Sequence, residues 1–249
     1  MILIPMAGLS SRFAKAGYAQ PKFMLEAHGE TLFEHSIKSF SRYFDIQDFV
    51  FVCSNENSIV NFVENKIAVL GIKHSLIVTV DHPTRGQAET VYIGLKKYLL
   101  SKNVQANRLN LTIFNIDTFR SNFEFPNLET MGDGYLEVFE GEGSNWSFAR
   151  PENDESTVVV ETAEKKAISN LCSTGLYYFR NSEDYILSFE QYITLPQILW
   201  EKGELYIAPL YNYLIKSGRQ VHYNKIPRES VIFCGIPEEY LQFLSSRHI

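Results

Sequence analysis

Through its first half the chain alternates short apolar runs with segments whose apolar residues recur every three or four positions. The runs predict strands at Ile2–Pro5, 49–52, 74–80 and 109–116. The periodic segments predict helices at about 32–40, 59–70 and 88–100. Thr31 and Glu34 have the spacing of a capping box at the start of the first helix. This βαβαβαβ order favours a mostly parallel sheet with helices on both faces.

The second half of the chain has a different pattern. Short strand-like runs follow one another without helices between them, at 135–140, 146–150, 157–161 and Leu171–Phe179. Helices are predicted again at Ser182–Tyr192, 210–217 and 237–246, with a strand near 220–226. We therefore expect an α/β fold in one domain over 1–249, in which about 121–249 forms a small mixed-strand extension to about 1–120.

Composition narrows the class of protein. A net charge of −6 gives no electrostatic reason to expect nucleic acid as a partner. The three cysteines, Cys53, Cys172 and Cys234, lie far apart in apolar surroundings, which predicts buried thiols rather than disulfides. The apolar run at the N-terminus is short for a signal peptide, and no stretch approaches the length of a membrane span. These features predict a cytoplasmic protein without a membrane span.

A small-residue turn after the first strand is the strongest chemical signal. Such a turn can direct several backbone amides at one anion, and Arg12 and Lys22 add a forked donor and a point charge. This set suits a polyphosphate, although an ordinary Gly/Ser turn remains the alternative. The predicted nucleotide-binding residues of this turn are Met6, Ala7, Gly8, Leu9, Ser10 and Ser11.

Two later segments fall at the same edge of the predicted sheet. Asp117 follows the strand 109–116, where its carboxylate can ligate Mg²⁺, although it can equally cap a turn. The segment 82–90 holds Gly86, which permits close backbone approach at the start of a helix, although it can be a simple Pro/Gly turn.

The order of these motifs resembles the nucleotidyltransferases that make nucleotide-diphospho-sugars. Their opening motif, G-x-G-[ST]-R…P-K, matches the segment from Gly8 to Arg12 and the pair Pro21-Lys22, with Ser10 where many members have Gly. The resemblance implies that Arg12 and Lys22 are catalytic and that Asp117 holds Mg²⁺. It also implies that the nucleobase lies against the residues His82, Gly86, Gln87 and Ala88.

Motifs of the second half resemble the acceptor side of the same family. On that mapping Glu164 receives acceptor hydroxyls, Lys165 binds the acceptor phosphate, and Thr174 and Gly175 line the acceptor site. A solvated charge run at 161–166 and a strand bulge at 174–175 are the alternatives. The family's second metal-binding Asp is missing, since Pro209 and Phe233 stand in its places; Asn212 or Glu204 could substitute.

The resemblance implies a metal-dependent enzyme of the bacterial polysaccharide-biosynthesis branch. An NTP and a phosphorylated acceptor, with a sugar 1-phosphate favoured, would give an NDP-acceptor and pyrophosphate for capsular or other surface polysaccharide. A cytidylyltransferase acting on a phosphocholine-like, amide or amino-acid phosphate stays open, as does a non-catalytic nucleotide-sensing or partner-binding homologue. The base and a homo-oligomeric state also stay open.

Overall fold

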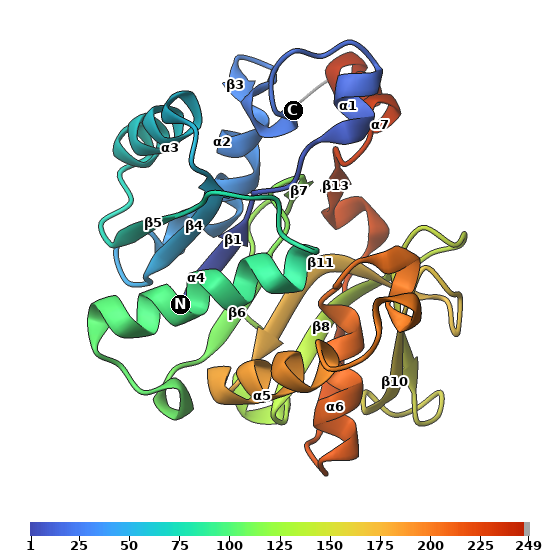
Figure 1. Ribbon diagram of the computed structural model, residues 1–249. Coiled ribbons are helices and arrows are strands. Elements are labelled where there is room, and N and C mark those ends of the chain that lie inside the picture. The colour runs from blue at the N-terminus through green and yellow to red at the C-terminus, as the bar shows by residue number, and fades with distance from the viewer. Residues whose placement is uncertain (247–249) are drawn as a thin grey trace.

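The computed structural model describes residues 1–246, whose first half forms a parallel sheet (Figure 1). Its strands are β1 (Ile2–Pro5), β4 (Phe49–Ser54), β5 (Ser75–Val80) and β6 (Leu111–Phe114). They lie in the order β6-β1-β4-β5, and each neighbouring pair is parallel. Strand β6 is shorter than the expected run 109–116, and a 3-10 turn at Ala106–Arg108 precedes it.

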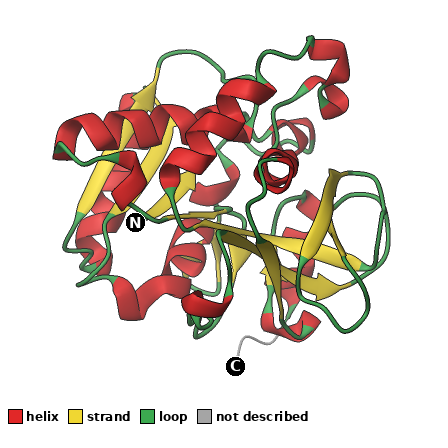
Figure 2. Ribbon diagram, turned by 90° about the horizontal axis from the view of Figure 1, so that it is seen from below, coloured by secondary structure: helices red, strands yellow, loops and turns green. Residues whose placement is uncertain are grey.

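Helices cover both faces of this sheet (Figure 2). Helix α4 (Gln87–Lys102) packs through Val91 and Leu95 against Leu3 and Val50 on one face. Helices α2 (Leu32–Ile37) and α3 (Asn57–Leu70) pack against the alternate strand residues on the other face. The period of two along each strand thus provides two cores from a single sheet.

Helix α2 begins with the predicted capping box. The Thr31 amide donates to Glu34 Oε2 (2.8 Å) and the Glu34 amide donates to Thr31 Oγ1 (3.3 Å). The helix is shorter than predicted, because Phe40 has non-helical dihedrals (φ −104°) and residues 38–43 form 3-10 turns.

The strands of the second half continue the same sheet. Strand β11 (Leu171–Phe179) pairs with β6 in the antiparallel direction, with Leu176 opposite Phe114. Its other neighbours are β8 (Gly134–Glu140) and β9 (Ser147–Pro151), and the sheet is extended by β10 (Val159–Glu164) and β12 (Val221–Lys225). The mixed-strand extension is therefore continuous with the parallel sheet. Strand β10 runs further than predicted, so Glu164 ends a strand instead of following one.

A small pairing not anticipated from the sequence brings the C-terminal region to the sheet edge. Strand β13 (Ile232–Phe233) lies antiparallel to β7 (Thr118–Phe119). As a result the Cys234 amide donates to the Asp117 carbonyl (2.8 Å), and the segment before α7 (Pro237–Ser245) reaches the loop after β6. The other elements are α1 (Ser11–Lys15), β2 (Glu26–Ala27), β3 (Glu30–Thr31), α5 (Ser182–Tyr192) and α6 (Tyr211–Lys216).

The expectation from composition about the cysteines agrees with the structure. Cys53, Cys172 and Cys234 are buried and free, as their apolar surroundings predict, and burial raises the pKa of the Cys53 and Cys172 thiols to about 11. Within residues 1–246 none of the helices combines the length and apolar character needed to cross a membrane.

Candidate active site

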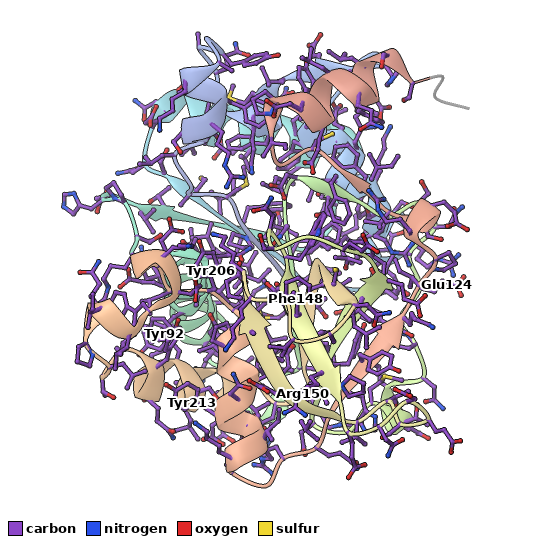
Figure 3. The ribbon with its side chains drawn as sticks, turned by 90° about the vertical axis from the view of Figure 1, so that its right-hand side faces the viewer. Tyr92, Glu124, Phe148, Arg150, Tyr206 and Tyr213 are labelled. Carbon is purple, nitrogen blue, oxygen red and sulfur yellow. The ribbon has the colours of Figure 1, made fainter. Side chains whose placement is uncertain are left out.

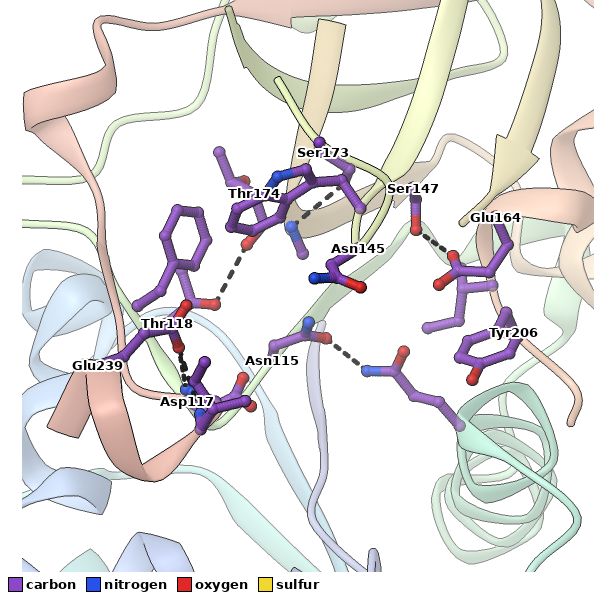
Figure 4. A pocket seen from close by; sticks show the side chains of 18 of the residues that line it. Asn115, Asp117, Thr118, Asn145, Ser147, Glu164, Ser173, Thr174, Tyr206 and Glu239 are labelled. Carbon is purple, nitrogen blue, oxygen red and sulfur yellow. Dashed lines mark hydrogen bonds between the residues drawn. The ribbon is translucent and has the colours of Figure 1, made fainter. Parts of the chain in front are cut away.

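Two adjoining cavities open at the carboxyl edge of the parallel strands. The first cavity, of about 610 Å³, lies between the turn after β1 and the start of α4. The second cavity, of about 530 Å³, lies over β9, β10 and β11 (Figure 4). Gln87, Asn115 and Asp117 line both cavities and form their boundary.

The turn after β1, for which a phosphate-binding role is predicted, lines the first cavity. All six predicted residues, from Met6 to Ser11, contribute to the wall. The amides of Gly8, Leu9 and Ser10 have no hydrogen-bond acceptor in the part of the chain that the structure describes. Ser10 is in the left-handed region (φ 47°), and its Oγ accepts from the Lys22 amide (3.3 Å). The turn therefore presents unused donors to the cavity, which is what an anion requires.

Lys22 and Asp117 form an ion pair at the boundary of the cavities. Lys22 Nζ donates to Asp117 Oδ2, and each side chain is 21% exposed. Substrate groups can reach both charges, because neither is fully enclosed.

A second carboxylate faces Asp117 across Gly235. A Cβ placed on Gly235 would lie 3.0 Å from Asp117 Oδ2 and 3.6 Å from Glu239 Oε2. Glu239 also caps α7, since its Oε2 accepts from the Gly235 amide (2.8 Å). Residues 1–246 contain no group of three or more His, Cys, Asp or Glu that would hold a metal by themselves. This set fits Mg²⁺, which is usually held by one or two carboxylates together with substrate phosphates.

The two residues considered as substitutes for the missing Asp differ in position. Both side-chain atoms of Asn212 bond to the Thr162 backbone, Oδ1 accepting (2.9 Å) and Nδ2 donating (2.8 Å), so Asn212 joins α6 to β10. Glu204 lines the first cavity. Glu239, which the sequence reasoning did not consider, is the carboxylate that faces Asp117.

The segment before α4 differs from its prediction. A Cβ on Gly86 (φ 148°) would overlap the carbonyl of Leu205, and the Ala88 amide donates to that carbonyl (2.9 Å). The close approach predicted at Gly86 is therefore made by the chain's own backbone. Ala88 is fully buried and lines neither cavity, and His82 lines a neighbouring hollow with Asn55. Only Gly86 and Gln87 of the four predicted residues border the first cavity.

Arg85 is a cation of the first cavity that the sequence reasoning did not select. Its guanidinium is held by Glu89, with Nε 2.9 Å from Oε1, and lies over the Trp200 ring at 5.6 Å. The sequence could have indicated Arg85, because it lies within the segment 82–90 that was predicted to fall at this edge of the sheet.

The second cavity contains most of the predicted acceptor residues. Glu164, Thr174 and Gly175 line it, and so does Arg12 from the start of the chain. Lys165 does not line it. Lys165 is in the left-handed region (φ 54°), and its Nζ donates to the Tyr206 hydroxyl and lies 4.3 Å from the centre of that ring. Lys165 therefore contacts the wall of the second cavity through Tyr206 instead of lining the cavity beside Glu164.

Gly175 makes room for Asn115 at the boundary. The register of β11 against β8 shifts between Ser173 and Tyr177, so the alternative of a strand bulge is present. A Cβ on Gly175 (φ 91°) would overlap Asn115 Nδ2, and Asn115 Oδ1 accepts from Gln87 Nε2 (Figure 4). The small residue therefore allows an amide pair to form where the cavities meet.

The fold is that of a nucleotidyltransferase, with two cavities bordered by the loop after β1 and the acid after β6. The chain is 55% identical to the nucleoside-diphosphate-sugar pyrophosphorylase from Vibrio cholerae RC9, over 99% of this chain and 100% of that chain, with a TM-score of 0.92. The chain therefore belongs to the nucleoside-diphosphate-sugar pyrophosphorylase family. The predicted fold, family and enzyme class are confirmed.

More distant structures share the fold alone. The inositol-1-phosphate CTP transferase from T. maritima is 14% identical, with a TM-score of 0.71.

 The match to the T. maritima transferase covers 98% of this chain and 94% of that chain. The UDP-glucose pyrophosphorylase from Acinetobacter baumannii is 16% identical, with a TM-score of 0.68 over 98% of this chain and 91% of that chain. No protein-family model matches the chain, and no curated protein sequence matches it.

Proposed function

We propose that this enzyme transfers a nucleotidyl group from an NTP to a phosphorylated acceptor of the sugar-phosphate class, in a Mg²⁺-dependent reaction that releases pyrophosphate. One observation supports it most: the two cavities share Gln87, Asn115 and Asp117. Two substrates bound in adjoining cavities would meet at these residues, which is the arrangement that a transfer between them needs.

In this proposal the NTP occupies the first cavity. The free amides of Gly8, Leu9 and Ser10 bind its phosphates, and Lys22 neutralises charge near the α-phosphate. Arg85, which lines the same cavity, adds a second cation. We assign to Arg12 a contact with the leaving pyrophosphate, made from the rim of the second cavity.

The acceptor occupies the second cavity. One oxygen of its phosphate bonds to the α-phosphorus while the bond to the pyrophosphate oxygen breaks in line. The chain contributes position and charge, without a covalent protein intermediate. Mg²⁺, when bound, would neutralise phosphate charge, and Asp117 with Glu239 opposite supplies carboxylate oxygens to hold it.

We also propose that the product supplies surface polysaccharide synthesis, as the family resemblance implies. Because nucleoside triphosphates are made in the cytoplasm, we propose that compartment for the reaction.

The direct test is pyrophosphate release from each of the four common NTPs against a panel of sugar 1-phosphates and non-sugar phosphates. We expect release with one dominant base, and loss of release when EDTA removes Mg²⁺. Full activity in EDTA would overturn the metal assignment. Binding of an NTP without release for any acceptor would overturn the proposed transfer.

A further inference from the structure

The second cavity has an excess of negative charge. Within residues 1–246 the cavity is lined by five carboxylates, and Arg12 is the one Lys or Arg among its lining residues. Two of the five have other roles, since Asp117 pairs with Lys22 and Glu239 caps α7. The other three have no Lys or Arg nitrogen within ion-pair distance in the described part of the chain: Glu142, Glu164 and Glu238.

Glu164 is the most informative of these carboxylates, because it is buried. Its exposed fraction is only 8%, and its Oε2 accepts from Ser147 Oγ (Figure 4). The neighbouring cation, Lys165, instead bonds to the Tyr206 hydroxyl. Burying a carboxylate without a cation costs free energy, so the site is incomplete until a ligand supplies positive charge. Desolvation raises the pKa of Glu164 although the bond from Ser147 and the charge of Lys165, which makes no ion pair with it, both lower it.

Aromatic rings form the other part of this wall. Trp146 and Phe233 both line the cavity, with ring centres 4.8 Å apart at 51°. Phe233 already contacts a cation, since the Arg228 guanidinium lies 4.9 Å from the centre of its ring. Aromatic faces beside carboxylates bind ammonium groups better than they bind neutral hydroxyls.

We propose that the phosphorylated acceptor carries an ammonium group, which binds in the second cavity between Glu164 and Trp146. An amino-sugar phosphate and a phosphorylated amino alcohol or amino acid share this chemistry. The proposal rests on the proposed function, because it names the acceptor class for the same cavity. The ammonium group takes no part in bond formation, so the transfer from NTP to acceptor phosphate is unchanged.

The experiment uses acceptor pairs that differ only in an ammonium group. Glucosamine 1-phosphate is compared with glucose 1-phosphate, and phosphoethanolamine with 2-hydroxyethyl phosphate. Pyrophosphate release gives kcat/KM for each, and calorimetry gives acceptor Kd without requiring turnover. We expect the ammonium member of at least one pair to be preferred about tenfold or more, as one desolvated cation contact allows. The pair that shows the preference distinguishes the sugar from the non-sugar source.

Glu164→Gln keeps the size of the side chain and removes its charge. We expect it to abolish the preference by raising the acceptor Kd, with the NTP Kd unchanged. Glu161→Gln is the matched control, because Glu161 lies on the same strand and pairs with Arg150 outside both cavities. Arg150 lies well apart from Tyr206 of the cavity wall (Figure 3).

The outcomes separate this proposal from the proposed function. Equal use of both members of each pair, or a preference that survives Glu164→Gln, would overturn the ammonium site alone. An ammonium preference in Kd without any pyrophosphate release would support the site and overturn the transfer. No binding by any of the four acceptors would overturn the site.

Discussion

The ammonium group of Lys22 donates to the carboxylate of Asp117, which is 95 residues away in the chain. This contact joins the loop after β1 to the loop after β6, at the boundary of the two cavities. Each charge neutralises the other when substrates are absent. Binding of a phosphate to Lys22 and of a cation to Asp117 would replace one ion pair by two, so the pair holds both groups near their proposed working positions.

Asp117→Ala should reduce Mg²⁺-dependent turnover by roughly a hundredfold or more, because the carboxylate proposed to hold the metal is lost. The fold should survive, since the side chain is partly exposed and Lys22 can be solvated. Steady-state pyrophosphate release and circular dichroism check the two statements. Asp81→Asn is the control, as Asp81 bonds to Asn55 on the surface. A folded Asp117→Ala protein with nearly normal kcat would show that the metal role is misassigned.

Lys22→Ala should weaken both NTP affinity and turnover, and Arg12→Lys should lower kcat although it conserves the charge, because the forked donor is lost. Calorimetry with NTP and Mg²⁺, followed by kinetics, measures both effects. Lys15→Ala is the control, because Lys15 is an exposed residue in the same short helix as Arg12, and it should have little effect on NTP affinity or turnover. If both Lys22→Ala and Arg12→Lys behave as the unmodified enzyme, the loop is only a Gly/Ser turn.

Gly175→Ala should lower both stability and activity. Its φ of 91° disfavours a side chain, and the added Cβ would overlap Asn115, whose bond to Gln87 would be lost. Strain of this kind costs about 1–3 kcal/mol. Gly71→Ala is the control: Gly71 also has a positive φ (74°), but nothing lies within 4 Å of its Cβ position. We expect the melting temperature to fall in both variants and the activity to fall only in Gly175→Ala. Equal activities of the two variants would exclude a role of the Asn115–Gln87 pair in activity.

Glu164→Gln should raise thermal stability near neutral pH. Desolvation raises the pKa of this carboxyl above its usual 4.5, so the folded protein binds its proton more tightly than the unfolded chain. Its contribution to the free energy of unfolding is complete below pH 4.5 and is lost as pH rises through the folded pKa. Besides desolvation, the groups that act on the pKa of Glu164 are Ser147 and Lys165, which lower it, and Glu201 and Glu204, which raise it.

Melting curves from pH 4 to 8 test the direction of this pH dependence. The melting temperature of Glu164→Gln should exceed that of the unmodified protein increasingly as pH rises, and the two should converge at the acid end. Glu161→Gln provides the baseline, because Glu161 is paired with Arg150 near the surface. A difference between the two melting temperatures that is largest at low pH would contradict the prediction.

Local patterns in the sequence were enough to predict much of the fold. The apolar run at Ile2–Pro5, the capping box at Thr31 and the helical spacing of 59–70 each depend on neighbours within a few positions. The positions of the turn after β1 and of the acid after β6 could also be predicted, since parallel strands end at one edge and place their following residues together. The family motif then identified the chemistry expected of these residues.

Contacts between distant segments could only be decided by the tertiary structure. Pairing of β13 with β7 places Glu239 opposite Asp117, and the Leu205 backbone takes the space that Gly86 leaves. Glu164 faces the second cavity while Lys165 turns to Tyr206, a difference that depends on one left-handed residue at the end of β10. Such contacts are absent from local periodicity, because they arise from the packing of surfaces that are far apart in the chain. The sequence by itself therefore determined the order of the elements and the position of the loop, and packing decided which side chains meet in the two cavities.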